Sequence, residues 1–181
     1  ITVGDLTVST AARAVTVTGA RLILTSAQQD FAGRPPLEVT LEVSINRRVT
    51  PLTVIVVHLK ASSGVDDKAR RARSAVALAQ HLSTLRGSVM IVGDWNDGLT
   101  RSISGGLSPF PEFEGAEWLT LGLEQRGEAS SVFGSFIDHA LVTKDLIDRH
   151  RSTTVHDLRA ARPDARTTTS DHFPVLHVFT P

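Results

Sequence analysis

The stretch SVMIVGDWND, at residues 88–97, constrains the fold more than any other part of the chain. Its first half is a continuous apolar run bounded by turn-forming residues, a pattern typical of a strand that is buried on both faces. Gly93 lets the backbone leave this strand along a path that a side chain would obstruct. We therefore predict a central strand whose exit carries Asp94 and Asn96, with Trp95 between them.

Asp94 and Asn96 combine a carboxylate with an amide two residues away. Such a pair can accept a proton, hold a hard cation or donate hydrogen bonds to an oxyanion. The ordinary alternative is an Asx-rich turn that closes a strand. The sequence around this pair does not decide between the two, so the decision depends on the rest of the chain.

Length and composition limit the possible classes of protein. The chain has 181 residues, of which 41% are hydrophobic, enough for one sizeable core. The net charge is zero, so no overall attraction to nucleic acid or to an anionic membrane is expected, although local patches are possible. The absence of cysteine excludes disulfides and thiolate metal sites, and no apolar run approaches the length of a membrane span. Because the chain begins at Ile1 without a signal-like segment, we expect a processed or truncated product.

Most of the chain has the pattern of β-strands. Apolar and polar residues alternate at 37–45, which predicts a strand with one buried face, and residues 52–59 become apolar on both faces, as in the centre of a sheet. Further strands are predicted at 21–25, 132–133, 137–143, 153–156 and 175–179.

One segment, residues 66–86, changes to a helical period. Its predicted apolar stripe consists of Ala69, Ala72, Val76, Ala79 and Leu82. Asp66 or Asp67 is suited to the N-cap and Gly87 to the position after the helix. Arginines 70, 71 and 73 lie off the stripe, so we expect a solvated face, with contact to a polyanion as the alternative. A second helix is predicted at 114–123. Many strands and few helices favour an α/β sandwich of largely antiparallel or mixed sheets.

Polar side chains mark the ends of four predicted strands. His58 and the Asp94–Asn96 pair lie at carboxyl ends, whereas Asp138 and the Asp171–His172 pair lie at amino ends. If the first two strands run one way and the last two the other way, all four ends meet at one edge. Each residue alone has an ordinary explanation as a turn or rim residue, but together they suggest a site.

Four motifs carry a resemblance to a known family. Residues 57–60, 93–97, 137–139 and 170–175 resemble motifs of the endonuclease/exonuclease/phosphatase superfamily, in that family's order, and the resemblance extends from about Gly33 to Phe179. It implies the deoxyribonuclease-like four-layer α/β sandwich, whose members hydrolyse phosphodiesters or phosphomonoesters with divalent cations. We expect residues 1–181 to form a single domain that corresponds to the carboxy-terminal portion of the family domain.

The resemblance also implies residue roles. Asp94 would orient or deprotonate water, and His58 and Asn96 would bind the phosphoryl group. His172 would act in acid/base catalysis or charge stabilisation, held by Asp138. The divalent cation, Mg²⁺ with Mn²⁺ or Ca²⁺ as alternatives, would be held by Asp171, Asp94 and Asn96. These roles suit a transition state that spreads negative charge over phosphoryl oxygens.

The family's amino-terminal part, with a Gln-Glu pair that supplies a principal metal ligand, has no counterpart in residues 1–32. Gln29 and Asp30 lie too close to 34–36 to be that pair. We therefore expect either a homo-oligomer or a complementing amino-terminal fragment. The expected substrate is a phosphoester, with nucleic acid as one candidate. The alternative is a catalytically degraded fragment that serves as a partner- or polyanion-binding module, which a metal-dependent hydrolysis assay distinguishes from an enzyme.

Overall fold

The computed structural model describes residues 7–10, 13–22, 29–45, 47–160 and 162–180. The strands are β1 (Thr7–Thr10), β2 (Arg13–Leu22), β3 (Leu37–Ile45), β4 (Arg48–His58), β5 (Ser88–Asp94), β6 (Ala116–Trp118), β7 (Asp138–Thr143), β8 (His150–Val155) and β9 (Val175–Phe179). The helices are α1 (Val65–Thr84), α2 (Leu121–Gln125), α3 (Lys144–Ile147), the 3₁₀ turn η1 (Leu158–Ala160) and α4 (Ala165–Thr168).

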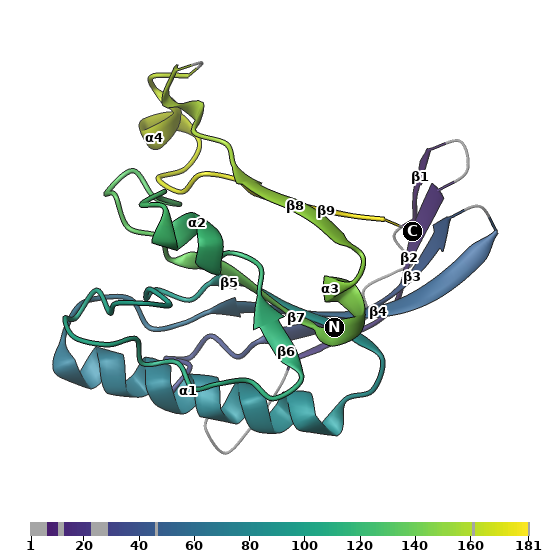
Figure 1. Ribbon diagram of the computed structural model, residues 1–181, viewed down its shortest axis with the longest axis horizontal. Helices are drawn as coiled ribbons and strands as arrows, with labels where there is room; N and C mark the ends of the chain where they lie inside the picture. The colour runs from purple at the N-terminus through teal and green to yellow at the C-terminus, as the bar shows by residue number, and fades with distance from the viewer. Residues whose placement is uncertain (1–6, 11–12, 23–28, 46, 161, 181) are drawn as a thin grey trace.

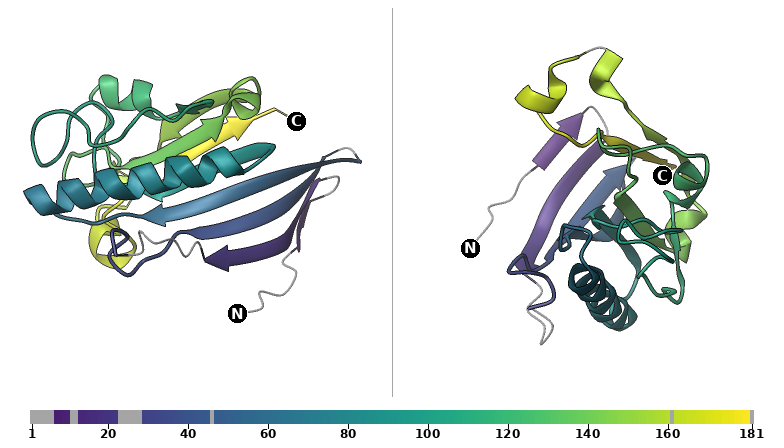
Figure 2. Two further views of the ribbon diagram at one scale, coloured as in Figure 1. Left: turned by 90° about the horizontal axis from the view of Figure 1, so that it is seen from below. Right: turned by 90° about the vertical axis from the view of Figure 1, so that its left-hand side faces the viewer.

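A mixed seven-stranded sheet, with the order β1-β2-β3-β4-β5-β7-β6, forms the middle of the molecule. The long helix α1 covers one face of this sheet, and the two-stranded sheet β8-β9 lies over the other face (Figure 1). Figure 2 shows the same layers from two further directions. The predicted α/β sandwich of mixed sheets is therefore confirmed.

The main core lies between α1 and the large sheet. Its buried members are Phe31, Ile55, Val57, Leu59, Ala75, Leu78, Leu82, Val89, Ile91, Trp95, Phe113 and Leu141. The strand predictions at 37–45, 89–92 and 175–179 agree with β3, β5 and β9. These segments can be predicted from sequence because an alternating apolar pattern indicates one buried strand face and a continuous apolar run indicates two.

Strand direction brings the predicted polar ends together. Strands β4 and β5 are parallel, joined by α1 as the crossover, and His58 lies opposite Asp94 in their register. Strand β7 runs antiparallel to β5 and begins at Asp138, which also lies opposite Asp94. The carboxyl ends of β4 and β5 and the amino end of β7 thus share one edge of the sheet, as predicted for strands that run in these directions. The fourth predicted strand, β9, pairs with β8 in the small sheet and does not belong to this edge.

The buried face of α1 differs from the predicted stripe. Its buried residues are Arg71, Ser74, Ala75, Leu78 and Leu82, so of the five stripe residues only Leu82 is fully buried. Val76 is 45% exposed. Arg70 and Arg73 are exposed as predicted, but the prediction for Arg71 was wrong. The N-cap is Gly64, not Asp66 or Asp67, and the C-cap is Leu85, so Gly87 lies one position beyond the place predicted for it. A stripe made largely of alanine constrains the helix rotation little, and a buried aspartate partner turns Arg71 inward.

Three other predictions need correction. The segment 114–123 forms β6 and only the start of α2, because pairing with β7 and aromatic packing of Trp118 override its helical pattern. Residues 132–133 form a turn, closed by the Gly134 N–H donating to the Ser131 carbonyl, and not a strand. The strand predicted at 21–25 is seen as the end of β2 at Leu22, and residues 23–28 lie outside the described residues.

Among the helices of the described residues, none combines the length and the apolar character that crossing a bilayer requires.

Candidate active site

The first part of the site is the pair formed by His58 and Asp94, which end β4 and β5. The His58 Nε2 atom lies 3.4 Å from Asp94 Oδ2. The side chain of His58 is half exposed, whereas that of Asp94 is mostly covered. The imidazole is therefore accessible to a ligand that approaches the carboxylate from solvent.

A second histidine–aspartate pair lies beside the first. His172 Nδ1 is 2.8 and 3.0 Å from the two carboxylate oxygens of Asp138. The segment that carries His172 is held by an isolated β-bridge to Ser131 and by the Phe173 N–H, which donates to the Ser130 carbonyl. Because Asp138 faces Asp94 across the β5–β7 pair, the two pairs form one cluster.

The turn after β5 fixes Asn96. Its backbone N–H donates to Asp94 Oδ1 at 2.8 Å, and its Nδ2 donates to Asp94 Oδ2 at 2.8 Å and to the Leu59 carbonyl at 3.1 Å. Asn96 has a positive φ of 53°, which asparagine tolerates better than most residues. The amide group therefore orients the Asp94 carboxylate in this structure.

Trp95, between Asp94 and Asn96, anchors this turn in the core. It is completely buried, and its ring makes edge contacts with Phe110, Phe113 and Trp118 at centroid distances of 5.2, 6.0 and 4.7 Å. Its indole N–H donates to the His139 carbonyl. The two polar residues on either side are thus held by a rigid aromatic cluster.

The electrostatics of the two pairs differ. Burial raises the pKa of Asp94, and the nearby Asp138 charge adds to this effect. The hydrogen bond from the Asn96 backbone N–H lowers the pKa, but by less than burial raises it. Burial alone would lower the pKa of His172, but the hydrogen bond and charge of Asp138, with Asp94 and Asp171, raise it overall. The cluster therefore combines a carboxylate of increased basicity with an imidazole that favours its charged form.

The oxygen donors around Asp94 suit a metal ion only in part. Asp94, Asn96 and Asp171 offer only oxygen ligands that a hard divalent cation prefers, so the donors fit in kind. In number they fall short: the described residues contain no group of three or more His, Cys, Asp or Glu placed to hold a metal ion. Asp171 is exposed, and its backbone carbonyl accepts from the Val132 N–H.

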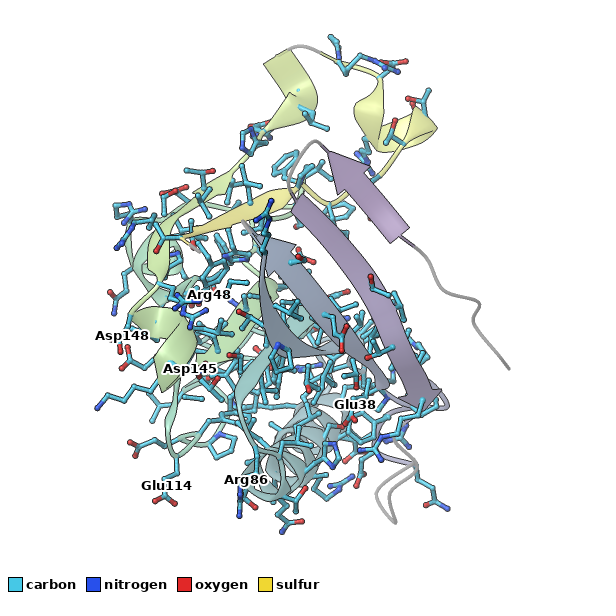
Figure 3. The ribbon with its side chains drawn as sticks, turned by 90° about the vertical axis from the view of Figure 1, so that its right-hand side faces the viewer. Glu38, Arg48, Arg86, Glu114, Asp145 and Asp148 are labelled. Atoms are coloured by element: carbon cyan, nitrogen blue, oxygen red, sulfur yellow. The ribbon has the colours of Figure 1, made fainter. Side chains whose placement is uncertain are left out.

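Glu38, a further carboxylate on β3, does not complete the set. Its oxygens bind Arg21, at 2.7 Å, and His81 of α1, at 2.6 Å. Figure 3 shows Glu38 beside α1.

Sequence reasoning missed one buried group next to this cluster. Asp97 is fully buried and pairs with Arg71 at 2.8 Å. Its position could have indicated it, because Asp97 is the last residue of the SVMIVGDWND stretch and follows Asn96 directly.

The sequence profile of the Endonuclease/Exonuclease/phosphatase family matches residues 12–172. A search of curated protein sequences finds no significant match. Among solved structures, the chain is similar to humanized D. rerio TDP2, with 16% identity and a TM-score of 0.61 over 92% of this chain and 68% of that chain.

Two further solved structures show the same likeness. For the human Nocturnin catalytic domain the identity is 16% and the TM-score 0.60, over 92% of this chain and 60% of that one. For the 3'-5' exonuclease NExo from Neisseria meningitidis the values are 17% and 0.62, over 91% and 72%. At these identities the likeness shows a shared fold, and the chain spans only part of each relative's length.

Proposed function

Because the chain belongs to the endonuclease/exonuclease/phosphatase family, we propose that it is a metal-dependent phosphoester hydrolase, and more specifically a phosphodiesterase. The observation that carries this proposal is the cluster of two histidine–aspartate pairs at the shared ends of β4, β5 and β7. A general base, a charged imidazole and hydrogen-bond donors in one place are what hydrolysis of a phosphoester needs.

In the proposed reaction Asp94 accepts a proton from water, whose oxygen attacks phosphorus. Its raised pKa makes the carboxylate a better base than an exposed aspartate. The half-exposed His58 contacts a phosphoryl oxygen, and Asn96 orients Asp94 and contributes its amide to the phosphoryl group when substrate displaces the present hydrogen bonds.

His172 acts on the other side of the phosphorus in this proposal. As the P–O bond to the leaving group breaks, the imidazolium donates a proton or a hydrogen bond to the leaving oxygen. Asp138 holds the ring through Nδ1, which leaves Nε2 to face the substrate. The pair favours the charged form of the imidazole, because Asp138 raises the pKa of His172 above its usual value.

Enzymes of the family generally use divalent cations. In our proposal Asp171, Asp94 and Asn96 would hold such an ion, with Mg²⁺ preferred and Mn²⁺ or Ca²⁺ as alternatives. When bound, the cation would offset negative charge on the phosphoryl oxygens. Because no group of three or more His, Cys, Asp or Glu among the described residues is placed to hold a metal ion, we expect weak binding.

We expect chelation with EDTA to abolish hydrolysis of bis(p-nitrophenyl) phosphate and of a DNA oligonucleotide, and excess Mg²⁺ to restore it. The rate as a function of Mg²⁺ concentration, with Ca²⁺ and Mn²⁺ compared, measures the affinity. Full activity after exhaustive chelation would contradict the metal requirement. No hydrolysis at any metal concentration, alone or with a supplied amino-terminal segment, would favour the binding-module alternative.

An exposed aromatic side chain supports nucleic acid as the substrate. The Phe133 ring is 67% exposed, and the Arg166 guanidinium lies 5.1 Å from its centroid. Phe133 is two residues from Ser131, which forms a β-bridge with His172, so Phe133 is close in sequence to a residue that contacts the site. Exposed rings paired with arginine are suited to stacking on nucleobases. A preference for the oligonucleotide over the small diester, lost in Phe133→Ala, is the expected result.

We further propose that a second copy or a complementing fragment covers apolar surface of the two sheets. Leu37 and Val56 lie opposite each other on the face of the large sheet that α1 does not cover, and are 38% and 43% exposed. On β9, Leu176 and Val178 are 50% and 43% exposed. An apolar cavity of about 200 Å³ between the sheets, lined by residues that include Met90, adds to this surface.

Light scattering of the purified chain is expected to give a mass of twice 19.5 kDa or more, or to reveal a bound second polypeptide. Leu37→Lys combined with Val56→Lys should shift the particle toward the single-chain mass, because charges on this face oppose burial. A clean single-chain mass for the unsubstituted protein would contradict this proposal.

A further inference from the structure

Arg71 is a charged side chain with no exposed surface, and it joins two loops of the site. Its Nε donates to Asp97 Oδ2 at 2.8 Å, and its other nitrogens donate to the carbonyls of Lys60 and Ser62, at 2.8 and 2.7 Å, and to Ser104 Oγ at 2.9 Å. Lys60 and Ser62 lie two and four residues beyond His58. The planar guanidinium fork makes these contacts at the same time, which a lysine cannot do.

Asp97 is the hub of the second loop. Its Oδ1 accepts from the backbone N–H groups of Gly98 and Ile103, at 3.0 and 2.7 Å, and its Oδ2 accepts from Ser102 Oγ as well as from Arg71. The carboxylate is therefore fully hydrogen-bonded inside the protein. It follows Asn96 directly, so its position fixes where the chain leaves the site.

A third buried side chain extends the network to β7. His139 is 2% exposed, and its Nε2 donates to the Asp97 carbonyl at 2.9 Å while its Nδ1 accepts from Thr120 Oγ1 at 2.9 Å. Burial lowers the pKa of His139 to about 4, so the ring is neutral at pH 7 and holds this tautomer. His139 follows Asp138 in the chain.

The hydrogen bonds of this network thus involve residues that are close in sequence to three groups of the proposed site: His58, Asn96 and Asp138. A buried ion pair is weak evidence for stability, because desolvation offsets most of its Coulomb attraction. A pair whose hydrogen bonds are all satisfied can instead fix one geometry.

We propose that Arg71 and Asp97 are positioning residues, which set the relative placement of His58, Asp94 and Asn96 for phosphoester hydrolysis. The proposal rests on the function proposed above. It predicts that loosening the pair acts on kcat more than on KM, because misplacing reacting groups by about 1 Å costs up to roughly 100-fold in rate.

The test is Arg71→Lys, which keeps the charge next to Asp97 but loses the fork. We expect kcat to fall about 10- to 100-fold with little change in KM. The matched control is Arg73→Lys on the same helix, where Arg73 pairs with Asp30 at 2.8 Å on the surface and is 56% exposed. The control should keep the kcat of the unsubstituted protein. Unchanged kcat in Arg71→Lys would overturn the proposal.

Amide hydrogen exchange gives a readout that does not depend on activity. In Arg71→Lys the amides of Asn96 and Ile103, which donate to Asp94 and Asp97, should exchange faster, while the amide of Ile91 in β5 keeps its rate. Equal acceleration at Ile91 would mean a general loss of stability and would also overturn the proposal. If the unsubstituted protein hydrolyses no phosphoester, the proposed function fails, and hydrogen exchange still tests the positioning.

If Arg71→Lys does not fold, the double variant Arg71→Gln with Asp97→Asn replaces it. This change removes both charges, so no unpaired charge remains buried. The same fall in kcat and the same local exchange are expected, since a glutamine cannot reach both loops. Retained kcat in this folded double variant would overturn the proposal.

Discussion

His172→Ala is expected to lower the turnover of a phosphodiester by roughly 10²- to 10⁴-fold, because it removes the positioned group that assists the leaving oxygen. The fold should survive, since His172 is partly exposed and its main side-chain contact is Asp138. The measurement is kcat at saturating Mg²⁺, with circular dichroism and a thermal melt to establish folding. Asp138→Asn should show a smaller loss, because it removes orientation and charge but keeps the imidazole.

The pH dependence provides a second readout of the same site. The rate should rise with pH as Asp94 loses its proton, at a pKa above the usual 3.8, and fall as His172 loses its proton, at a pKa above the usual 6.5. Asp138→Asn should move the alkaline limb to lower pH, because the charge that holds the imidazolium is gone. Activity retained by a folded His172→Ala at saturating metal would contradict the assigned role.

Gly93→Ala is expected to lower the free energy of unfolding by about 3 kcal/mol or more. A Cβ at this position would lie 2.1 Å from the carbonyl oxygen of Val57, which belongs to the neighbouring central strand β4 and cannot move away. Gly93 also has a φ of +134°, which residues with a side chain rarely adopt. Urea unfolding measures the change.

Gly115→Ala serves as the matched control for this prediction. Gly115 also has a positive φ, of +72°, but a Cβ there would meet nothing within 4 Å. We expect a loss of about 1–2 kcal/mol, from backbone strain alone. Equal losses in the two variants would show that the contact with Val57 has no separate cost.

Gly93 also shows what could be predicted from sequence. An apolar run followed by a glycine and a polar cluster predicted a central strand whose end has no room for a side chain at the glycine. Strand β5 is central, and a Cβ at Gly93 would clash with Val57. The same kind of local pattern placed His58, Asp94 and Asp138 at strand ends, because the end of an apolar run marks where a buried strand reaches solvent. Their common edge depends on strand direction, which only the structure decides; their catalytic roles stay predictions.

The partners of these residues were decided by tertiary structure. The helical pattern predicts that Arg71 lies on the surface. It is buried because it pairs with Asp97, which lies 26 positions later in the sequence. Likewise Glu38 is an available carboxylate in the sequence, but in the fold it binds Arg21 and His81. Local sequence determines which segments are buried, since periodicity records one face of one element. Which polar groups meet inside depends on long-range packing, where the cost of an unpaired buried charge selects the pairing.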